Sequence, residues 1–445
     1  MAESSGLVTA KTAIGEALDR LRDELTRFGE DIFDHPELGY REERTAALVA
    51  DELRRLGLEP QQRLALTGVK ARLRGASPGP TVCVMGELDA LPVPDHPRAD
   101  RTTGAAHACG HNAQLTHVVG VARALVETNA VRELAGDVVF MAVPAEEYVD
   151  LEWRTGLARA GKIEFLGGKS ELIRIGAFDD VDMVMLVHSA ARPGVRQLSI
   201  SWAANGLVAK RVRFLGRAAH AGAAPHRGIN ALNAATLALQ AIHMQRETFR
   251  DEDQIRVHPI MTRGGTTINV VPAETRLETF VRGLTYEAMA DAEAKVDRAL
   301  RAGAMAVGAT VEIETLPGYL PLQVDPLLAA IFKRNALELV GESEWGEVAS
   351  IAASTDAGDL SHVMPVLHPS HAGCAGSNHA ADFAITGFET AYVLPAKAMA
   401  WTVLDLLSNG AAEARAVLEG FKPRFSRDEY LAHMRGLARM ERTEY

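Results

Sequence analysis

The segment His107-Ala-Cys109-Gly-His111-Asn112 contains a thiol and two imidazoles in one short stretch. A cysteine thiolate and a histidine imidazole two positions apart can both face one cation from a turn. This mixture of sulfur and nitrogen donors suits zinc and neighbouring transition metals. A buried cysteine followed by a histidine that caps a helix would give the same pattern. For this segment alone, both interpretations stay open.

A pair of adjacent carboxylates, Glu146 and Glu147, closely follows the apolar run Val138 to Val143. Adjacent side chains at the end of a strand point in different directions. One carboxylate can therefore bind a metal while the other acts as general base toward a metal-bound water. Taken alone, such a pair is more often a solvated acidic loop. The Cys-His segment and the further histidines weaken that alternative.

Two other histidines are candidates for the same cation site. His188 ends a short apolar run, where a core histidine with satisfied hydrogen bonds would also fit. His379 lies in a polar loop, and spacing alone does not separate it from His368 and His371.

Two polar residues further along the chain could stabilise negative charge on a substrate oxygen. His220 stands among alanines and glycines, where it could donate to an oxyanion or cap a turn, and its position alone favours the turn. Asn269 follows the pair Gly264-Gly265, which permits a tight turn. Its amide could hold a substrate carbonyl or only the local backbone.

The apolar pattern around these residues predicts alternating helices and strands. A helical stripe runs from Ile14 to Ile32 and ends before Pro36, and a second helix runs from about Glu42 to Leu56, with Gly57 as its C-terminal cap. Buried strands are predicted at Val69 to Leu73, Thr81 to Met85, Val138 to Val143 and Val181 to Val187. This alternation predicts an α/β fold with a mostly parallel sheet and helices on both faces.

In such a sheet the ligand site lies beyond the carboxyl ends of the strands. The acidic residues and the histidine that follow three of the predicted strands would therefore meet at one edge: Glu87, Asp89, Glu146, Glu147 and His188.

Residues 199–315 show a different pattern, with strands that alternate apolar and polar residues. They predict a small two-layer α+β domain inserted into a catalytic domain formed by 1–198 and 316–445. Its predicted elements are a strand that ends at Gly216, helices at Ile229 to Gln245 and Tyr286 to Ala302, and strands at Ile255 to Ile260, Thr267 to Val271, Arg276 to Val281 and Ala309 to Glu314.

The overall composition excludes several classes of protein. The 445 residues include 47 Lys and Arg against 58 Asp and Glu, and the formal charge of −11 argues against a general nucleic-acid binder. No apolar run is long enough for a bilayer, and the first residues do not read as a signal peptide, so we expect a cytoplasmic protein with no membrane partner. Three cysteines, an odd number in a long chain, make a disulfide framework unexpected.

The motifs together resemble a known family of dinuclear metallohydrolases, related to aminoacylase and carboxypeptidase G. The segments that carry the resemblance, in chain order, are GELDALP, HACGHN, PAEE, VHS, AAHAGAAPH, INVVP, STDAGDLS and SNHAADF. More narrowly, the chain is similar to the amidohydrolase branch that includes hippurate hydrolase, indole-acetyl-amino-acid hydrolases and aminobenzoyl-glutamate hydrolase. The likeness runs from about His35 to about Leu407.

The resemblance implies a role for each of these residues. The ligands of two divalent metals would be Cys109, His111, Glu147, His188 and His379. Glu146 would be the general base, and Asp89 would orient a ligand. His220 and Asn269 of the small lid and dimerisation domain would stabilise the oxyanion, with His220 reaching the partner subunit of a homodimer or higher oligomer. Manganese or zinc suits this donor set, and cobalt or nickel is possible as well.

The chain also departs from this pattern. Ser189 and Asn112 replace the proline and the aspartate that relatives often have beside the ligands, and the segment Tyr148 to Ile175, with Trp153, Arg154 and Lys162, is longer than in the simplest relatives. This segment could be a substrate-specific wall or a surface insertion without a role. Arg282 could bind a substrate carboxylate or be an ordinary surface arginine.

The leading hypothesis is therefore hydrolysis of the amide bond of a small molecule, an N-acyl or N-aroyl amino acid or a peptide-like substrate. In an alternative hypothesis the same site cleaves a different bond. An amino group is removed hydrolytically from an anthranilate-type aromatic ring, and ammonia leaves. A non-catalytic binding protein on the same fold is the third possibility. The complete set of ligands and the base argue against it.

Overall fold

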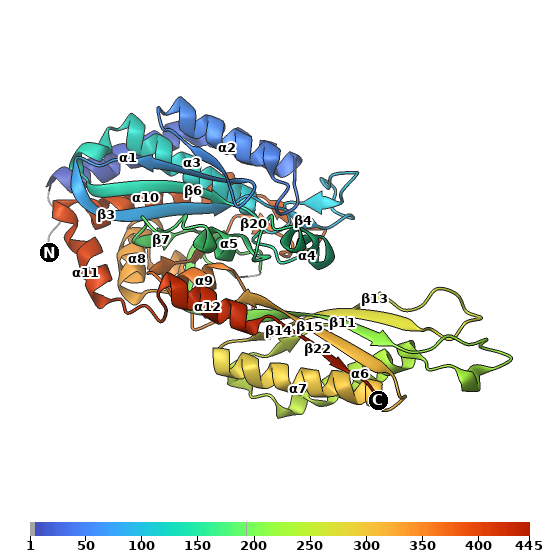
Figure 1. Ribbon diagram of the computed structural model, residues 1–445. Helices are drawn as coiled ribbons and strands as arrows, with labels where there is room; N and C mark the ends of the chain where they lie inside the picture. Colours follow the sequence, from blue (N-terminus) through green and yellow to red (C-terminus); the bar gives the residue numbers. More distant parts are fainter. Residues whose placement is uncertain (1–4, 193) are drawn as a thin grey trace. The chain divides into compact units, whose positions relative to one another are not determined.

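The computed structural model in Figure 1 describes residues 5–192 and 194–445. They form two compact units. The first contains the chain up to Trp202 together with Gln323–Ala349 and Asp359–Arg424, and the second contains Ala203–Leu322, Ser350–Gly358 and Phe425–Tyr445.

The first unit is built on a six-stranded sheet. In spatial order its strands are β1 (Gln61–Leu64), β2 (Gly68–Leu73), β6 (Ala135–Val143), β3 (Ser77–Glu87), β7 (Met183–Met185) and β18 (Val366–Leu367). The pairs β6/β3, β3/β7 and β7/β18 are parallel, whereas β1/β2 and β2/β6 are antiparallel. The central strands β3 and β6 are buried along most of their length because helices cover both faces, which is why their sequences read as continuous apolar runs.

Helices lie above and below this sheet in Figure 1. Those above it are α1 (Ser5–Asp34), α2 (Glu43–Arg55) and α3 (His111–Glu127), and α10 (Leu394–Leu407) packs against α1 and α3. The others of this unit named here are α4 (Leu151–Arg159), α5 (Gly168–Arg174), α8 (Pro326–Val340) and α11 (Ala412–Gly420). Gly57 has a φ of 78° directly after α2 and is the predicted C-terminal cap. The α/β class with helices on both faces is thus confirmed.

A short second sheet positions part of the site. Its strands, in order, are β17 (Trp345–Val348), β9 (Leu198–Ser201), β19 (Pro369–His371) and β8 (His188–Ser189). The strand predicted at Val181 to Val187 is therefore shorter than expected. After Met185 the chain leaves the main sheet, and His188 pairs with Ser370 in the second sheet. Two hairpin-like ribbons, β4 (Leu91–Pro92) with β5 (Ala105–Ala106) and β20 (Cys374–Ala375) with β21 (Ala384–Ile385), complete the strands named in this unit.

The second unit is a two-layer α+β structure, as predicted. Its sheet has the order β12 (Arg256–Val257), β14 (Glu274–Gly283), β11 (Gly206–Leu215), β15 (Thr310–Tyr319) and β22 (Arg439–Thr443), and β13 (Ile260–Arg263) also pairs with β14. The helices α6 (Ala231–Met244) and α7 (Tyr286–Met305) pack against the apolar face of this sheet, and α12 (Arg427–Leu437) precedes β22. Strand β14 alternates half-buried and buried residues along its whole length, the pattern of a sheet covered on one face.

Three expectations for this unit differ from the structure. The strand predicted at Ile255 to Ile260 is divided between β12 and β13, and Thr267 to Val271 forms a turn because the Gly264-Gly265 pair lets the chain fold back instead of extending. The chain after residue 315 was expected to return wholly to the first domain. Residues 425–445 instead belong to the second unit, because β22 pairs antiparallel with β15 and covers that edge of the sheet.

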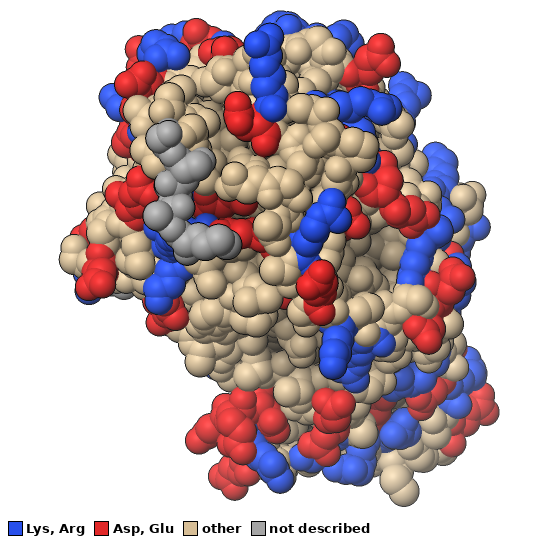
Figure 2. All heavy atoms as spheres, turned by 90° about the vertical axis from the view of Figure 1, so that its left-hand side faces the viewer, with Lys and Arg blue, Asp and Glu red and all other residues tan. Residues whose placement is uncertain are grey.

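The chemistry of the surface and of the thiols agrees with the composition. On the face drawn in Figure 2, Lys and Arg side chains are interspersed with Asp and Glu side chains, and the described residues on it show no basic stripe. All three cysteines, Cys83, Cys109 and Cys374, carry free thiols. Within the described parts of the chain, no helix has the length and apolar character to cross a membrane.

Candidate active site

The predicted site residues of the first unit meet at one edge of its main sheet. Glu87 ends β3 and Asp89 follows it, Glu146 and Glu147 come shortly after β6, and His188 comes shortly after β7. Because these three strands are parallel, their carboxyl ends deliver the side chains to the same place.

Cys109 and His111 reach this edge from the turn that begins α3. Gly110 has a φ of 83° at the N-terminus of that helix, a left-handed conformation that glycine adopts without strain. A Cβ atom at this position would lie 2.5 Å from the hydroxyl oxygen of Ser189, so the close approach also requires glycine. The Ser189 hydroxyl in turn donates to the carbonyl oxygen of Cys109 at 2.6 Å. Ser189, next to His188, thus holds the cysteine-bearing turn in place.

The five predicted ligands form two groups that share Cys109. The donor atoms of Cys109, His111 and His188 lie within 4.8 Å of one another, and so do those of Cys109, Glu147 and His379. The Cys109 sulfur is 3.5 Å from Nε2 of His188 and 3.2 Å from Nε2 of His379, which in turn is 3.0 Å from Glu147 Oε1. Such spacing allows a cation in each group.

The structure distinguishes His379 from its neighbours in sequence. His379 has a φ of 66°, and its backbone N–H donates to the carbonyl oxygen of Ala108 at 2.7 Å, which turns its ring toward Cys109. His368 instead stacks on the His188 ring at 5.8 Å, and His371 packs edge-on against His117 at 5.3 Å. Among the described residues, neither His368 nor His371 belongs to a group able to hold a metal.

Asp89 holds the backbone of Glu146 and Glu147 and the ring of His111 in place. Its two carboxylate oxygens accept the backbone N–H groups of Glu146 and Glu147 at 3.1 and 3.0 Å, and its carbonyl oxygen accepts from Nδ1 of His111 at 2.8 Å. A carbonyl can only accept, so the proton of the His111 ring is on Nδ1 and Nε2 faces the cluster. This is the geometry that an orienting residue needs.

The charges of the cluster favour a bound cation. Burial and the Glu147 carboxylate raise the pKa of the Cys109 thiol, but the imidazoles of His188 and His379 outweigh them and lower it to about 5. The Glu147 carboxylate raises the pKa of His379 to about 12. Protons are thus attracted to a site rich in negative charge, and a metal ion that binds there would replace them.

Two buried atoms show that the residues fit a metal. Nε2 of His111 and Oε1 of Glu147 have no solvent exposure and no contact with hydrogen-bond geometry among the described residues, although Glu87 and His379 each place a charged atom 3.0 Å from one of them. Buried polar atoms are rarely left without a partner in a folded protein. With the histidine rings neutral, the form that binds a metal, four carboxylates (Glu87, Asp89, Glu146 and Glu147) and the Cys109 thiolate against the positive charge of Lys169 give a formal charge of −4, which two divalent cations would balance.

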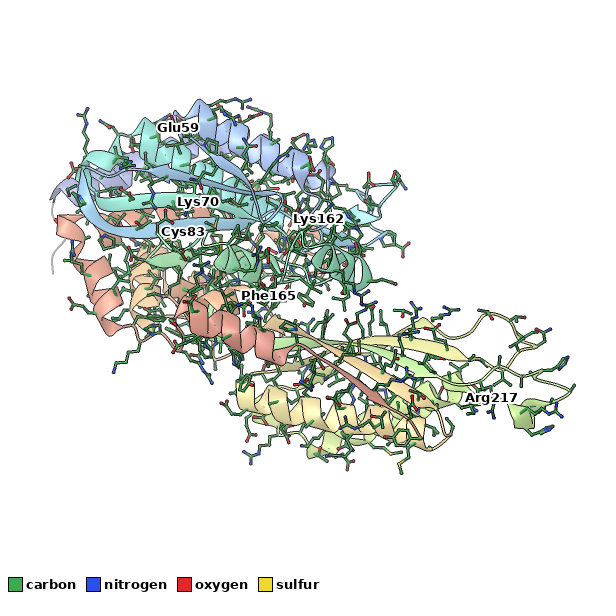
Figure 3. All side chains as sticks on the ribbon, in the orientation of Figure 1. Glu59, Lys70, Cys83, Lys162, Phe165 and Arg217 are labelled. Carbon is green, nitrogen blue, oxygen red and sulfur yellow. The ribbon has the colours of Figure 1, made fainter. Side chains whose placement is uncertain are left out.

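The second unit carries the predicted oxyanion residues on adjacent segments. His220 forms an isolated antiparallel bridge with Val270, next to Asn269, and both side chains are exposed. Nδ1 of His220 accepts the backbone N–H groups of Gly222 and Ala223 at 3.2 and 3.0 Å, so a neutral ring carries its proton on Nε2. Figure 3 labels Arg217 at the start of this loop.

Asn269 is prepared in the same way. Its side-chain oxygen accepts from the Thr267 hydroxyl at 2.8 Å, which leaves the amide N–H groups for another acceptor. Each of the two residues therefore has its acceptor atom occupied and presents a donor to its surroundings. Arg282 lies half-buried on β14, with its guanidinium 5.3 Å from the centre of the Phe280 ring.

Glu42 supports the site but is not among the residues that the sequence predicted for it. Glu42 is fully buried, accepts the backbone N–H of Ala145 at 2.8 Å and the Thr67 hydroxyl at 2.6 Å, and so supports the loop that carries Glu146. Burial and the nearby Asp89 raise the pKa of Glu42 to about 7. No local sequence signal marks this role, because Glu42 lies at the start of an ordinary amphipathic helix.

The longer segment Tyr148 to Ile175 is exposed around Lys162 and at Ile175 and is buried at α5. Residues 168–173 of α5 are buried, and the backbone N–H of Gly168 donates to the carbonyl oxygen of Ala145 at 3.1 Å. The Tyr40 hydroxyl lies within hydrogen-bond distance of the carbonyl oxygens of Phe165 and Gly167 at 3.0 and 3.1 Å, and the Arg41 guanidinium stacks on Trp153. Phe165 and the exposed Lys162, both labelled in Figure 3, lie between α4 and α5 in chain order.

Comparison with known proteins decides the family. The model of the peptidase dimerisation domain of M20 enzymes matches residues 203–306. The chain is 30% identical over 447 residues to the Xaa-Arg dipeptidase of Mus musculus, with 93% of this chain and 92% of that protein covered.

The chain belongs to the M20 peptidase family.

Other members show the same relationship. The N-acyl-L-amino acid amidohydrolase of Geobacillus stearothermophilus is 26% identical, with 70% of this chain and 81% of that protein covered. The crystal structure of a dinuclear metal-binding M20 peptidase from Bacillus subtilis shares the fold, with a TM-score of 0.63 at 21% identity and with 87% of this chain and 99% of that chain covered. The resemblance read from the motifs is confirmed, and this M20 member is a hydrolase.

Proposed function

We propose that this M20 hydrolase cleaves the amide bond of an N-acyl or N-aroyl amino acid, or of a dipeptide-like substrate, with two divalent metal ions. The observation that carries the proposal is the pair of donor groups that share Cys109, with Glu146 beside them. The ions would be held by Cys109, His111, Glu147, His188 and His379. Bound there, they would supply Lewis acidity to a water molecule and to the substrate carbonyl.

The residues of the chain have distinct roles in this proposal. Glu146 acts as general base, since its Oε2 lies 3.9 Å from Nε2 of His111 and its backbone is fixed by Asp89. It removes the proton from the attacking water and passes it to the leaving nitrogen. His220 and Asn269 donate hydrogen bonds to the oxygen that becomes negatively charged.

The exposure of His220 and Asn269 supports a homodimer formed through the domain at residues 203–306, in which His220 serves the partner's site. Arg282 is proposed to bind the substrate carboxylate. Manganese or zinc is the proposed metal, and a cytoplasmic location is proposed as well.

The test combines metal content with product analysis. Protein purified without chelator is expected to contain about two divalent ions per chain. It is expected to release amino acids from a panel of N-acyl amino acids, N-aroyl amino acids and Xaa-Arg dipeptides. Ammonia from an aryl amine without amino-acid release would replace this proposal with hydrolytic deamination. Two bound ions with no turnover of these compounds or of aryl amines would contradict both.

A further inference from the structure

The carboxylate of Glu87 lies inside the cluster but is not among the predicted ligands. Its Oε2 is 3.0 Å from Nε2 of His111, and Glu87, His111 and Glu146 form a third group whose donor atoms lie within 4.8 Å of one another. Although Glu87 and His111 lie this close, their contact does not have hydrogen-bond geometry, and Nε2 of His111 forms no hydrogen bond with any described residue. A neutral His111 ring carries its proton on Nδ1, so its Nε2 and the Glu87 oxygen are two acceptor atoms that face each other in a fully buried place.

A positive charge beside two such acceptors relieves the repulsion between their lone pairs. A proton on Nε2 would form an ion pair with Glu87 at 3.0 Å but without hydrogen-bond geometry, so it would use the two lone pairs poorly. A metal ion would use both lone pairs at once.

Each carboxylate oxygen of Glu87 also accepts a hydrogen bond from another side chain. Lys169 donates to Oε1 at 2.6 Å, and both side chains have 0% exposure. Gln114 donates from Nε2 to Oε2 of Glu87 at 2.7 Å and accepts the backbone N–H of Glu87 at 3.2 Å, so the orientation of its amide is fixed. The carboxylate is therefore held at both oxygens, with one side of Oε2 turned to His111.

The chain positions Lys169 as closely as it positions the carboxylate. Lys169 is the second residue of α5, directly after Gly168. A Cβ atom at Gly168 would lie 1.6 Å from the carbonyl oxygen of Pro144, so glycine is required for this contact with the loop before Glu146. A lysine buried completely, rather than at the surface, is unusual unless it is paired.

We infer that Glu87 is a further ligand of the cation held by His111, and that Lys169 and Gln114 are positioning residues that fix its carboxylate for this task. The inference rests on the cation site of the proposed function but not on the reaction catalysed there. It also gives the segment Tyr148 to Ile175 a role, since that segment supplies Lys169.

The test measures metal binding without substrate. Zn²⁺ affinity is determined by competition with a chelator, and Co²⁺-loaded protein is examined by visible absorption, which reports the ligands of the ion. Glu87→Gln is expected to bind one of two ions at least about tenfold more weakly, with the other unchanged, and to change the Co²⁺ spectrum. Unchanged affinity and spectrum would overturn the inference.

Two more variants separate ligation from folding. Lys169→Met leaves Glu87 buried without its cation, so it is expected to lower both the melting temperature and the metal affinity. The double variant Glu87→Gln, Lys169→Met removes both charges and is expected to regain melting temperature while its metal affinity stays low. Wild-type affinity in the double variant would contradict a ligand role for Glu87.

Lys162→Met is the matched control, because Lys162 lies in the same segment and is exposed. It is expected to match the wild type in every measurement. A wild-type protein that binds two ions and hydrolyses no amide would contradict the proposed function and leave this inference standing.

Discussion

The metal cluster of the first unit and the His220 loop of the second unit are held in opposite ways. In the cluster, side chains from three strand ends, a helix start and a distant loop fix one another, and Asp89 alone receives three hydrogen bonds from two segments. In the loop, His220 and Asn269 are exposed and held by residues two or three positions away. In the first arrangement the side chains support one another within the unit, whereas the second presents donors to its surroundings.

Under the proposed function this difference separates two tasks. A cluster that must hold closely spaced charges needs rigid, buried support, since every charge is costly unless another balances it. A group that must meet a substrate only in the transition state can stay in water until then. We therefore expect substitutions in the cluster to change metal binding or the proton transfer, and substitutions in the loop to change kcat alone.

The largest expected effect is that of Glu146→Gln. Because the amide cannot accept the proton of water, we expect kcat to fall at least about 10³-fold, with metal content and melting temperature unchanged. Steady-state kinetics on the best panel substrate, with elemental analysis of the same sample, would check this. Turnover equal to the wild type would remove Glu146 as the base.

The next effect is that of His220→Ala, for which we expect kcat to fall by about 10²-fold to 10³-fold with unchanged metal content. The exposed His226 of the same loop gives the control, since His226→Ala should keep wild-type kinetics.

A mixing experiment sharpens this prediction. When inactive Glu146→Gln and His220→Ala proteins are mixed and allowed to exchange subunits, about a quarter of the wild-type activity should return if His220 serves the partner's site. If exchanged dimers form and no activity returns, His220 acts within its own chain.

A smaller effect is expected from Asp89→Asn. The asparagine can accept only one of the two N–H groups of Glu146 and Glu147, so the loop that carries both carboxylates loses a support. We expect the metal affinity to fall by about 10-fold to 100-fold, measured by chelator competition. Exposed Asp95→Asn is the control, and equal affinity in both variants would show that the cluster orients itself without Asp89.

The smallest effect concerns stability and pH. Burial, together with Asp89, raises the pKa of Glu42 from 4.5 to about 7, so the folded protein binds this proton more tightly than the unfolded chain does. The resulting stabilisation is complete below pH 4.5 and is lost as the pH rises through 7.

Glu42→Gln removes this dependence. Relative to the wild type, we expect the free energy of unfolding of Glu42→Gln to rise by about 3 kcal/mol between pH 4.5 and pH 8, measured by chemical denaturation. Exposed Glu43→Gln should show no such trend. A difference that is constant with pH would mean that Glu42 is ionised throughout this range.

The sequence by itself determined the layers of the fold and the candidates for the site. The 3.6-residue apolar period predicted α1 and α2, and continuous apolar runs predicted most strands of the main sheet. Both patterns are local, because they follow from which faces of a helix or strand are buried. The positions just after strands pointed to Glu146, Glu147 and His188, since parallel strands end at one edge.

The tertiary structure alone decided which candidates meet. Spacing gave no reason to prefer His379 over His368 or His371, because the choice depends on a loop whose left-handed residue turns the ring toward Cys109. The pairing of β22 with β15, the support of the Glu146 loop by Glu42 and the contact of Lys169 with Glu87 join residues 82 to over 100 positions apart. Such contacts leave no local pattern, since they depend on close packing between distant segments rather than on the conformation of either one.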